Sequence, residues 1–194
     1  MTAQPKPKKL KERLEGRLIT LERHRMKNAP VYYRALQDRN ITRYLGDYPP
    51  PASLEEEKKF IRSSQRAWRK GEKAAYTILL NETGEVVGSI GLNNINWRSR
   101  NAKIGTFVMP EYWGRGINTE AKHLLINYAF NQLGLQRLEL HIAEKNIRSY
   151  KATEKLGAVL EGVLRRNAKL RGRYHNMRVY GILREEWRER QRQR

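Results

Sequence analysis

The stretch Val108–Ala121, which reads VMPEYWGRGINTEA, constrains the fold of this chain more than any other segment. An apolar run ends at Pro110, glycines follow at Gly114 and Gly116, and a helical pattern begins at Ile117. Because proline interrupts a strand and glycine permits tight turns, this order predicts a strand, a turn and a helix. The unpaired amides and partial positive charge of the helix N-terminus, next to two glycines, suit a phosphate or pyrophosphate.

This junction alone is also compatible with an ordinary structural turn. The third glycine of the dinucleotide fingerprint is replaced by Thr119, and no Gly-Lys-Ser/Thr of a Walker loop follows. Other parts of the chain must therefore decide between a turn and a ligand site.

Periodicity and turn residues divide the chain into strands and helices. Strands are expected at residues 17–21, 76–80, 86–91, 102–109, 137–143, 158–166 and 174–183. Helices are expected at residues 28–39, 53–70, 117–133 and 147–156. Residues 185–194 are either a short helix or a frayed tail. This order predicts an α+β fold with a mixed sheet in one domain, residues 12–187, between a disordered basic arm (residues 1–11) and a basic tail (residues 188–194).

The net charge of +20 is concentrated at the two ends of the chain. Residues 1–27 hold nine Lys or Arg and three Glu, and residues 163–194 hold eleven and three. Such a field attracts polyanions, including RNA, phosphorylated cofactors and acidic proteins, and repels polycationic substrates. The single acidic cluster, Glu55–Glu57, is interpreted as the capped start of a helix.

Composition also narrows the chemistry. The chain has no cysteine, which excludes disulfides and an acyl-thiol intermediate and suits a cytoplasmic location. Its four histidines lack metal-ligand spacing, so no metal is expected. No apolar run approaches the roughly 20 residues that span a bilayer, so no membrane contact is expected.

Several motifs in fixed order resemble the GNAT acetyltransferases, and in particular their RimJ/RimL-like branch of ribosomal-protein N-terminal acetyltransferases. They are YWGRGINTEA, the strand LELHI, Asn146-x-x-Ser149, Glu154-Lys-Leu-Gly157 and the final segment from Gly172 to Trp187. The resemblance covers about residues 16–187. It implies acetyl-CoA as cofactor and a mostly antiparallel sheet of about six or seven strands, splayed in the middle and flanked by about four helices.

The resemblance also implies roles for individual residues. The pyrophosphate would be held by Gly114, Arg115, Gly116, Ile117, Asn118 and Thr119. Val108 and Met109 would pair with the pantetheine arm, and one of their amides would polarise the thioester carbonyl. Asn146 would bind the pantetheine or hold its loop, or it is an ordinary helix-start residue. Ser149 would protonate the leaving thiolate, with Tyr150 as second choice.

The chain departs from the family pattern where a catalytic carboxylate is common. Lys103 and Ala168 occupy two such positions, and Asn118 is larger than the usual Ala or Gly. The general base is therefore left open between Glu120, His141 and a chain of water molecules, with His175 a further candidate.

The acceptor that suits this charge is a protein N-terminal α-amine, for example on a ribosomal protein. A small-molecule amine is the alternative acceptor. A scaffold that has lost catalysis and binds the ribosome or RNA through its basic ends is the rival function. Direct attack in a ternary complex is the expected mechanism, by a monomer or a homodimer.

Overall fold

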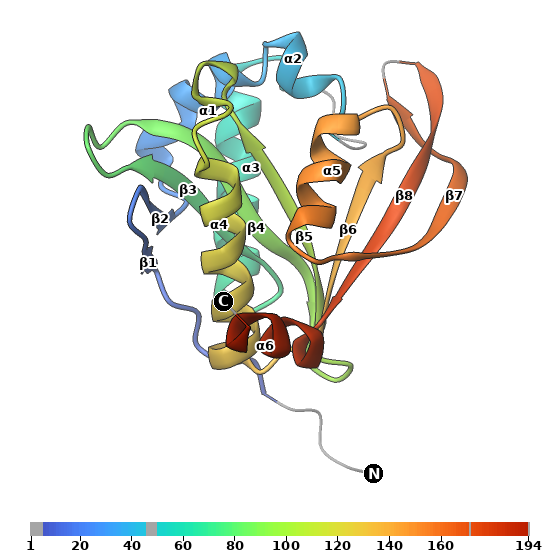
Figure 1. The fold of residues 1–194 in the computed structure, drawn as a ribbon. Coiled ribbons are helices and arrows are strands. Elements are labelled where there is room, and N and C mark those ends of the chain that lie inside the picture. The colour runs from blue at the N-terminus through green and yellow to red at the C-terminus, as the bar shows by residue number, and fades with distance from the viewer. Residues whose placement is uncertain (1–5, 46–49, 171, 194) are drawn as a thin grey trace.

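The computed structural model describes residues 6–45, 50–170 and 172–193, which form eight strands and six α-helices (Figure 1). The strands are β1 (Arg13–Glu15), β2 (Ile19–Arg23), β3 (Ala74–Leu80), β4 (Val86–Asn96), β5 (Asn101–Val108), β6 (Arg137–Ala143), β7 (Val159–Leu170) and β8 (Arg173–Leu183). The α-helices are α1 (Ala29–Ala35), α2 (Arg39–Thr42), α3 (Leu54–Arg69), α4 (Ile117–Asn127), α5 (Ile147–Lys155) and α6 (Arg184–Arg192). The predicted α+β class with a mixed sheet is confirmed.

One sheet holds all eight strands in the order β1-β2-β3-β4-β5-β6-β8-β7. Neighbouring strands are antiparallel except β5 and β6, which run parallel. Their pairing covers residues 101–103 of β5 and 137–139 of β6, and from there the two strands separate (Figure 1). This separation is the splay that the resemblance implies. It opens the sheet next to Val108, at the end of β5.

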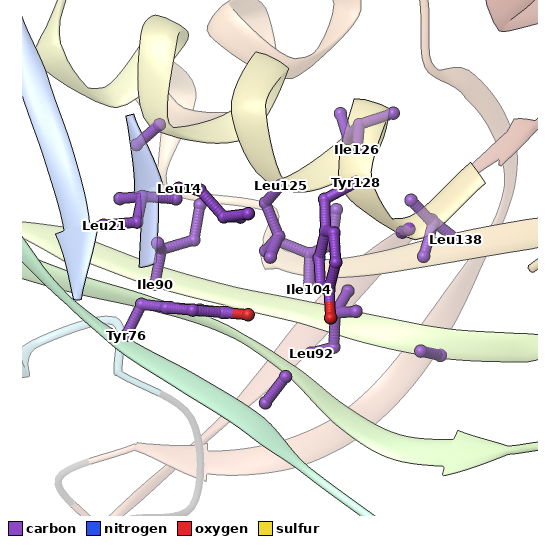
Figure 2. Close-up of a cluster of buried hydrophobic side chains, with 14 of the residues drawn as sticks. Leu14, Leu21, Tyr76, Ile90, Leu92, Ile104, Leu125, Ile126, Tyr128 and Leu138 are labelled. Carbon is purple, nitrogen blue, oxygen red and sulfur yellow. The ribbon is translucent and has the colours of Figure 1, made fainter. Parts of the chain in front are cut away.

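The two faces of the sheet are covered by different helices. On one face, Leu125 of α4 and Tyr128 lie against Leu92 and Ile104 of the sheet (Figure 2). On the other face, Phe107 packs with residues of α1 and α3. Because side chains alternate along a strand, β5 directs its even-numbered residues toward α4 and its odd-numbered residues toward α1 and α3.

The sequence explains where α3 begins and which side it buries. The Ser53 hydroxyl accepts a hydrogen bond from the Glu56 amide at 3.2 Å, and the Glu56 carboxylate accepts one from the Ala52 amide at 2.5 Å. This confirms the predicted capping. The buried residues of the helix follow one stripe, at positions 57, 61, 64 and 68. The first of them, Glu57, is a carboxylate where an apolar side chain is usual.

The structure has more elements than the sequence predicts. The sheet has eight strands rather than six or seven, because β1 adds a three-residue strand beside β2. The helix expected over residues 28–39 ends at Ala35, and a separate helix, α2, begins at Arg39. Asp38 caps α2 by accepting a hydrogen bond from the Asn40 amide. The predicted helix over residues 117–133 ends at Gly134 as expected, but residues 128–133 are π-helical.

The two basic ends are in contact with the domain over part of their length. Leu10 is buried, and the Lys11 amide donates a hydrogen bond to the Tyr128 hydroxyl at 2.7 Å. Residues 1–5 of the predicted arm lie outside the described residues. At the other end, the helix α6 extends to Arg192 and buries Trp187, so the segment predicted as a tail begins inside this helix.

Candidate active site

A cavity of about 600 Å³ lies where β5 and β6 separate. This volume is within the range of ligand sites. Residues from the end of β5, the start of α4, the start of α5 and the α2 segment surround it. Of the residues predicted to bind cofactor, it is lined by Val108, Gly114, Gly116, Ile117, Asn118, Thr119, Asn146 and Ser149. Met109 and Arg115 are not among its lining residues.

The N-terminus of α4 faces this cavity with its amides uncapped by side chains. Gly116 is the N-cap residue, with φ 77°, and no side chain of the described residues caps the helix there. Gly114 has φ 78°, and a Cβ built on it would meet nothing within 4 Å. Both glycines adopt the left-handed conformation that side chains disfavour. The turn therefore exposes several amides to an anion, which fits the pyrophosphate of CoA.

Three cationic side chains that were not among the predicted cofactor-binding residues also line the cavity: Arg43, Lys145 and Arg148. The Arg148 guanidinium lies 3.2 Å from the centroid of the Trp113 ring. Burial, and then the neighbouring Arg43, hold the pKa of Arg148 below its usual value. A group of cations with unfavourable mutual repulsion suits a polyanionic ligand such as CoA.

The ladder between β4 and β5 distinguishes the two candidate oxyanion donors. The Met109 amide donates to the Val87 carbonyl at 2.9 Å, so it is engaged by β4. Successive amides of a strand point to opposite sides, and the Val108 amide therefore points away from β4, toward the splay. The Val108 carbonyl accepts a hydrogen bond from the Trp113 indole at 2.6 Å. Only Val108 of the pair is placed to present its amide to a ligand.

Asn146 and Ser149 lie together at the start of α5. The Asn146 side chain is the N-cap and accepts a hydrogen bond from the Ser149 amide at 3.4 Å. Both residues line the cavity. Tyr150 is not a lining residue; its ring lies 4.4 Å from the Arg178 guanidinium carbon.

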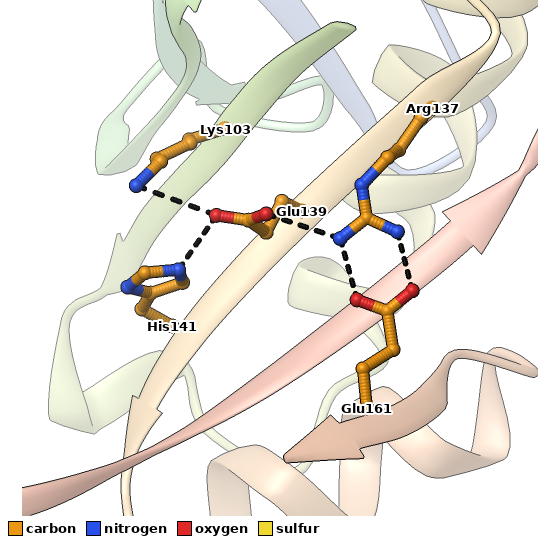
Figure 3. Close-up of polar contacts among 5 residues, drawn as sticks. All are labelled: Lys103, Arg137, Glu139, His141 and Glu161. Carbon is orange, nitrogen blue, oxygen red and sulfur yellow. Dashed lines mark hydrogen bonds and ion pairs between the residues drawn. The ribbon is translucent and has the colours of Figure 1, made fainter. Parts of the chain in front are cut away.

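None of the three side chains named as candidate bases, Glu120, His141 and His175, lines the cavity. The Glu120 carboxylate accepts hydrogen bonds from the backbone amides of Arg17 and Leu18. His141 is bonded through Nε2 to Glu139 at 2.6 Å (Figure 3). Glu139 also pairs with Lys103 and Arg137, so this histidine is part of a charged network on the sheet.

Asn118 departs from the small residue of the family pattern and has a partner of its own. The Thr106 hydroxyl donates a hydrogen bond to the Asn118 Oδ1 at 3.2 Å. The larger side chain thus ties the start of α4 to β5.

A second cavity, of about 310 Å³, lies on the α1 and α3 side of β5. Leu45, Thr106 and Phe107 line both cavities, so the two meet at the end of β5. The second cavity contains Glu57, which belongs to the acidic cluster interpreted above as the start of a helix. The signal that could have identified it is spacing: position 57 lies four residues before Ile61 on the buried stripe of α3.

The chain matches the family described as Acetyltransferase (GNAT) domain over residues 18–159, more than half of its length. The chain belongs to this GNAT family. The acetyltransferase is therefore an acetyl-CoA-dependent enzyme that transfers an acetyl group to an amine. Its described residues contain no group of three or more potential metal ligands. No helix among them is long and apolar enough to cross a membrane.

Several relatives are similar to this GNAT chain. The uncharacterised N-acetyltransferase p20 of Bacillus licheniformis is 28% identical over 91% of this chain and 98% of its own length. YdaF of Bacillus subtilis, whose name describes a ribosomal N-acetyltransferase, is 36% identical over 54% of this chain and 57% of its own. The spermidine N(1)-acetyltransferase of Escherichia coli is 34% identical over 48% of this chain and 50% of its own.

The solved structure of Mycobacterium smegmatis RimJ in complex with CoA-disulfide has the same fold. It is 24% identical, with a TM-score of 0.80, and the match covers 87% of this chain and 83% of that one.

Proposed function

We propose that this acetyltransferase modifies the N-terminal α-amine of a protein, by direct attack in a ternary complex. The observation that carries the proposal is the meeting of two cavities at Leu45, Thr106 and Phe107. One cavity offers uncapped helix amides and cations to a cofactor, and the other reaches the same end of β5 from the opposite face. Two ligands held in this way would bring their reacting atoms together without a covalent enzyme intermediate.

The chain's own residues would act on the cofactor as follows. The amides at the start of α4, from Gly114 to Thr119, would hold the pyrophosphate, and Arg148 would add a charge contact. Acetyl-CoA supplies the acetyl group as an activated thioester. The Val108 amide would donate a hydrogen bond to the thioester oxygen, and Ser149 would deliver a proton to the departing sulfur.

Two considerations favour a protein N-terminus as the acceptor. The net charge of +20 would attract an acceptor embedded in RNA or carried by an acidic protein. An α-amine has a pKa near 8, so part of it is neutral at working pH. YdaF, with a name that describes a ribosomal enzyme, is consistent with this choice. The basic ends would then help to dock the enzyme on the ribosome.

A polyamine is the second candidate acceptor, because the spermidine acetyltransferase relative matches about half of the chain. The experiment that separates the candidates measures kcat/KM for N-terminal peptides, spermidine and an aminoglycoside at equal ionic strength. Preferential acetylation of peptides supports the proposal, and turnover of the polycations alone overturns it. Salt-sensitive RNA binding without turnover of any amine would instead support the rival scaffold function.

A further inference from the structure

The second cavity contains a buried carboxylate that the cofactor site does not use. Glu57 is 4% exposed and lies on the inward stripe of α3. Among the described residues, its carboxylate has no hydrogen bond or ion pair within 4 Å. A carboxylate at the wall of a cavity, with no protein partner at bonding distance, is available to pair with a cationic ligand that enters the cavity.

The charged and titratable groups around Glu57 come from each element that forms the cavity. Lys73, just before β3, is half-buried, with its Nζ 4.6 Å from the centroid of the Phe60 ring. His24, after β2, is bonded to the Ser89 hydroxyl, and burial lowers the pKa of its imidazole to about 4. Tyr32 of α1 is held by Thr77, and burial raises the pKa of its phenol.

Glu56, the remaining acidic residue that lines the cavity, is exposed and accepts the hydrogen bond from the Ala52 amide. His24 is neutral at pH 7 because its pKa is low. Glu57 is therefore the one buried acid of the described cavity lining, with Lys73 as its cationic neighbour.

We propose that Glu57 binds the ammonium group of the acceptor in this cavity and takes the proton that must leave before the amine can attack. The inference rests on the proposed function, since it assigns this cavity to the acceptor. Burial is the main reason that the pKa of Glu57 rises to about 7, and the charge of Lys73 partly opposes the rise. A base with such a pKa suits proton transfer near neutral pH.

In the proposed acetyl transfer, the acceptor amine, Glu57, Ser149 and the thioester account for every proton moved and every bond formed or broken. One proton moves from the acceptor nitrogen to a Glu57 carboxylate oxygen, which leaves a neutral amine. The nitrogen lone pair forms the N–C bond to the acetyl carbon, and the C–S bond breaks with its electrons on sulfur. The second proton of the nitrogen passes to that sulfur through Ser149, and Glu57 later returns its proton to solvent.

Lys73 limits which amines can enter. A cation in the cavity repels a second positive charge on the acceptor, so a polyamine is disfavoured. The other walls include the apolar side chains of Leu36, Phe60 and Phe107. The cavity therefore suits a single ammonium group with apolar atoms beside it, as at the N-terminus of a peptide that begins with apolar residues.

The test compares Glu57→Gln with Glu55→Gln, which removes an exposed carboxylate from the same turn of α3. We expect Glu57→Gln to lower kcat/KM for peptide amines by about 100-fold or more, and Glu55→Gln to change it less than about twofold. The ionisation of the acceptor amine affects both enzymes equally, so it cancels in the ratio of wild-type to Glu57→Gln kcat/KM. That ratio should therefore rise with pH as the Glu57 carboxylate of the wild type loses its proton, with a midpoint near 7. Calorimetric binding of acetyl-CoA and the melting temperature verify that the variant is folded.

Lys73→Met provides an independent readout. It should raise the ratio of spermidine to peptide kcat/KM by on the order of tenfold, which is the effect of one charge about 10 Å away at an effective dielectric near 20. If wild-type enzyme acetylates no peptide amine, the proposed function fails. If it does, but Glu57→Gln matches wild type or the ratio is flat with pH, the role of Glu57 is overturned.

Discussion

The Glu120 carboxylate accepts hydrogen bonds from the Leu18 amide at 3.0 and 3.1 Å, and it thereby joins the first turn of α4 to the turn between β1 and β2. It also accepts one from the Arg17 amide. A carboxylate that satisfies two backbone donors stabilises the fold, and this accounts for Glu120 without a catalytic role.

Glu120→Ala should therefore lower the free energy of unfolding by about 1–3 kcal/mol, because two amides lose a charged acceptor. The pH dependence of kcat/KM should stay as in wild type. Chemical denaturation and a pH–rate profile measure both effects, and Glu82→Ala, an exposed residue, is the control. A lost ionisation in the Glu120→Ala profile would restore this residue as a candidate base.

Gly116→Ala and Gly84→Ala form a matched pair, since both glycines have φ above 70° and neither added Cβ would be closer than 3.8 Å to a neighbour. Each substitution should destabilise the fold by about 1–2 kcal/mol through backbone conformation alone. Only Gly116→Ala should also weaken acetyl-CoA binding, by about tenfold or 1.4 kcal/mol, because its methyl group projects beside the amides of α4. Calorimetry of both variants decides; equal affinities would place the phosphate site elsewhere.

Arg148→Ala should raise the Kd for acetyl-CoA about tenfold and leave kcat within a factor of about three, since the cation contributes to binding rather than to the reacting atoms. The loss should shrink as salt is added, because screening weakens the charge contact in wild type. Arg98→Ala, in an exposed turn, serves for comparison. A fall in kcat with unchanged Kd would contradict this role.

Glu57 should make the stability of the protein depend on pH. Its pKa is about 7 when folded and near 4.5 ordinarily, so between these values the folded state binds more protons than the unfolded state. The stability from this group is present at low pH and is lost as pH rises through 7. Glu57→Gln should thus be more stable than wild type at pH 8.5, by on the order of 1–3 kcal/mol, with a smaller difference at pH 5.5. Denaturation at both pH values measures this, and a difference that does not grow with pH would argue against the buried carboxylate.

The parts of the fold that could be predicted from sequence are those with local causes. The turn at Gly114 and Gly116 and the cap at Ser53 were correctly predicted because glycine conformation and capping act within a few residues. The strand β1 was missed because its three residues gain their place only by pairing with β2.

Sequence predicted only those residues of the candidate site that lie close to one another along the chain. The cofactor cavity gathers most of the residues implied by the family resemblance, because they lie at the ends of neighbouring elements. The base was not predictable in this way. The Glu120 carboxylate is bonded by the backbone amides of Arg17 and Leu18, which are distant in sequence. Glu57 becomes a candidate only because α3 packs against the sheet beside the end of β5.

The short parallel pairing of β5 and β6 makes the sheet two half-sheets joined by three residue pairs. Beyond these three pairs, where β5 and β6 separate, the two half-sheets are in contact through side chains and loops. Acetyl-CoA bound between the separated strands would contact both half-sheets and so hold them together. Its occupancy should make the halves melt together, and the melting temperature should climb with the logarithm of cofactor concentration.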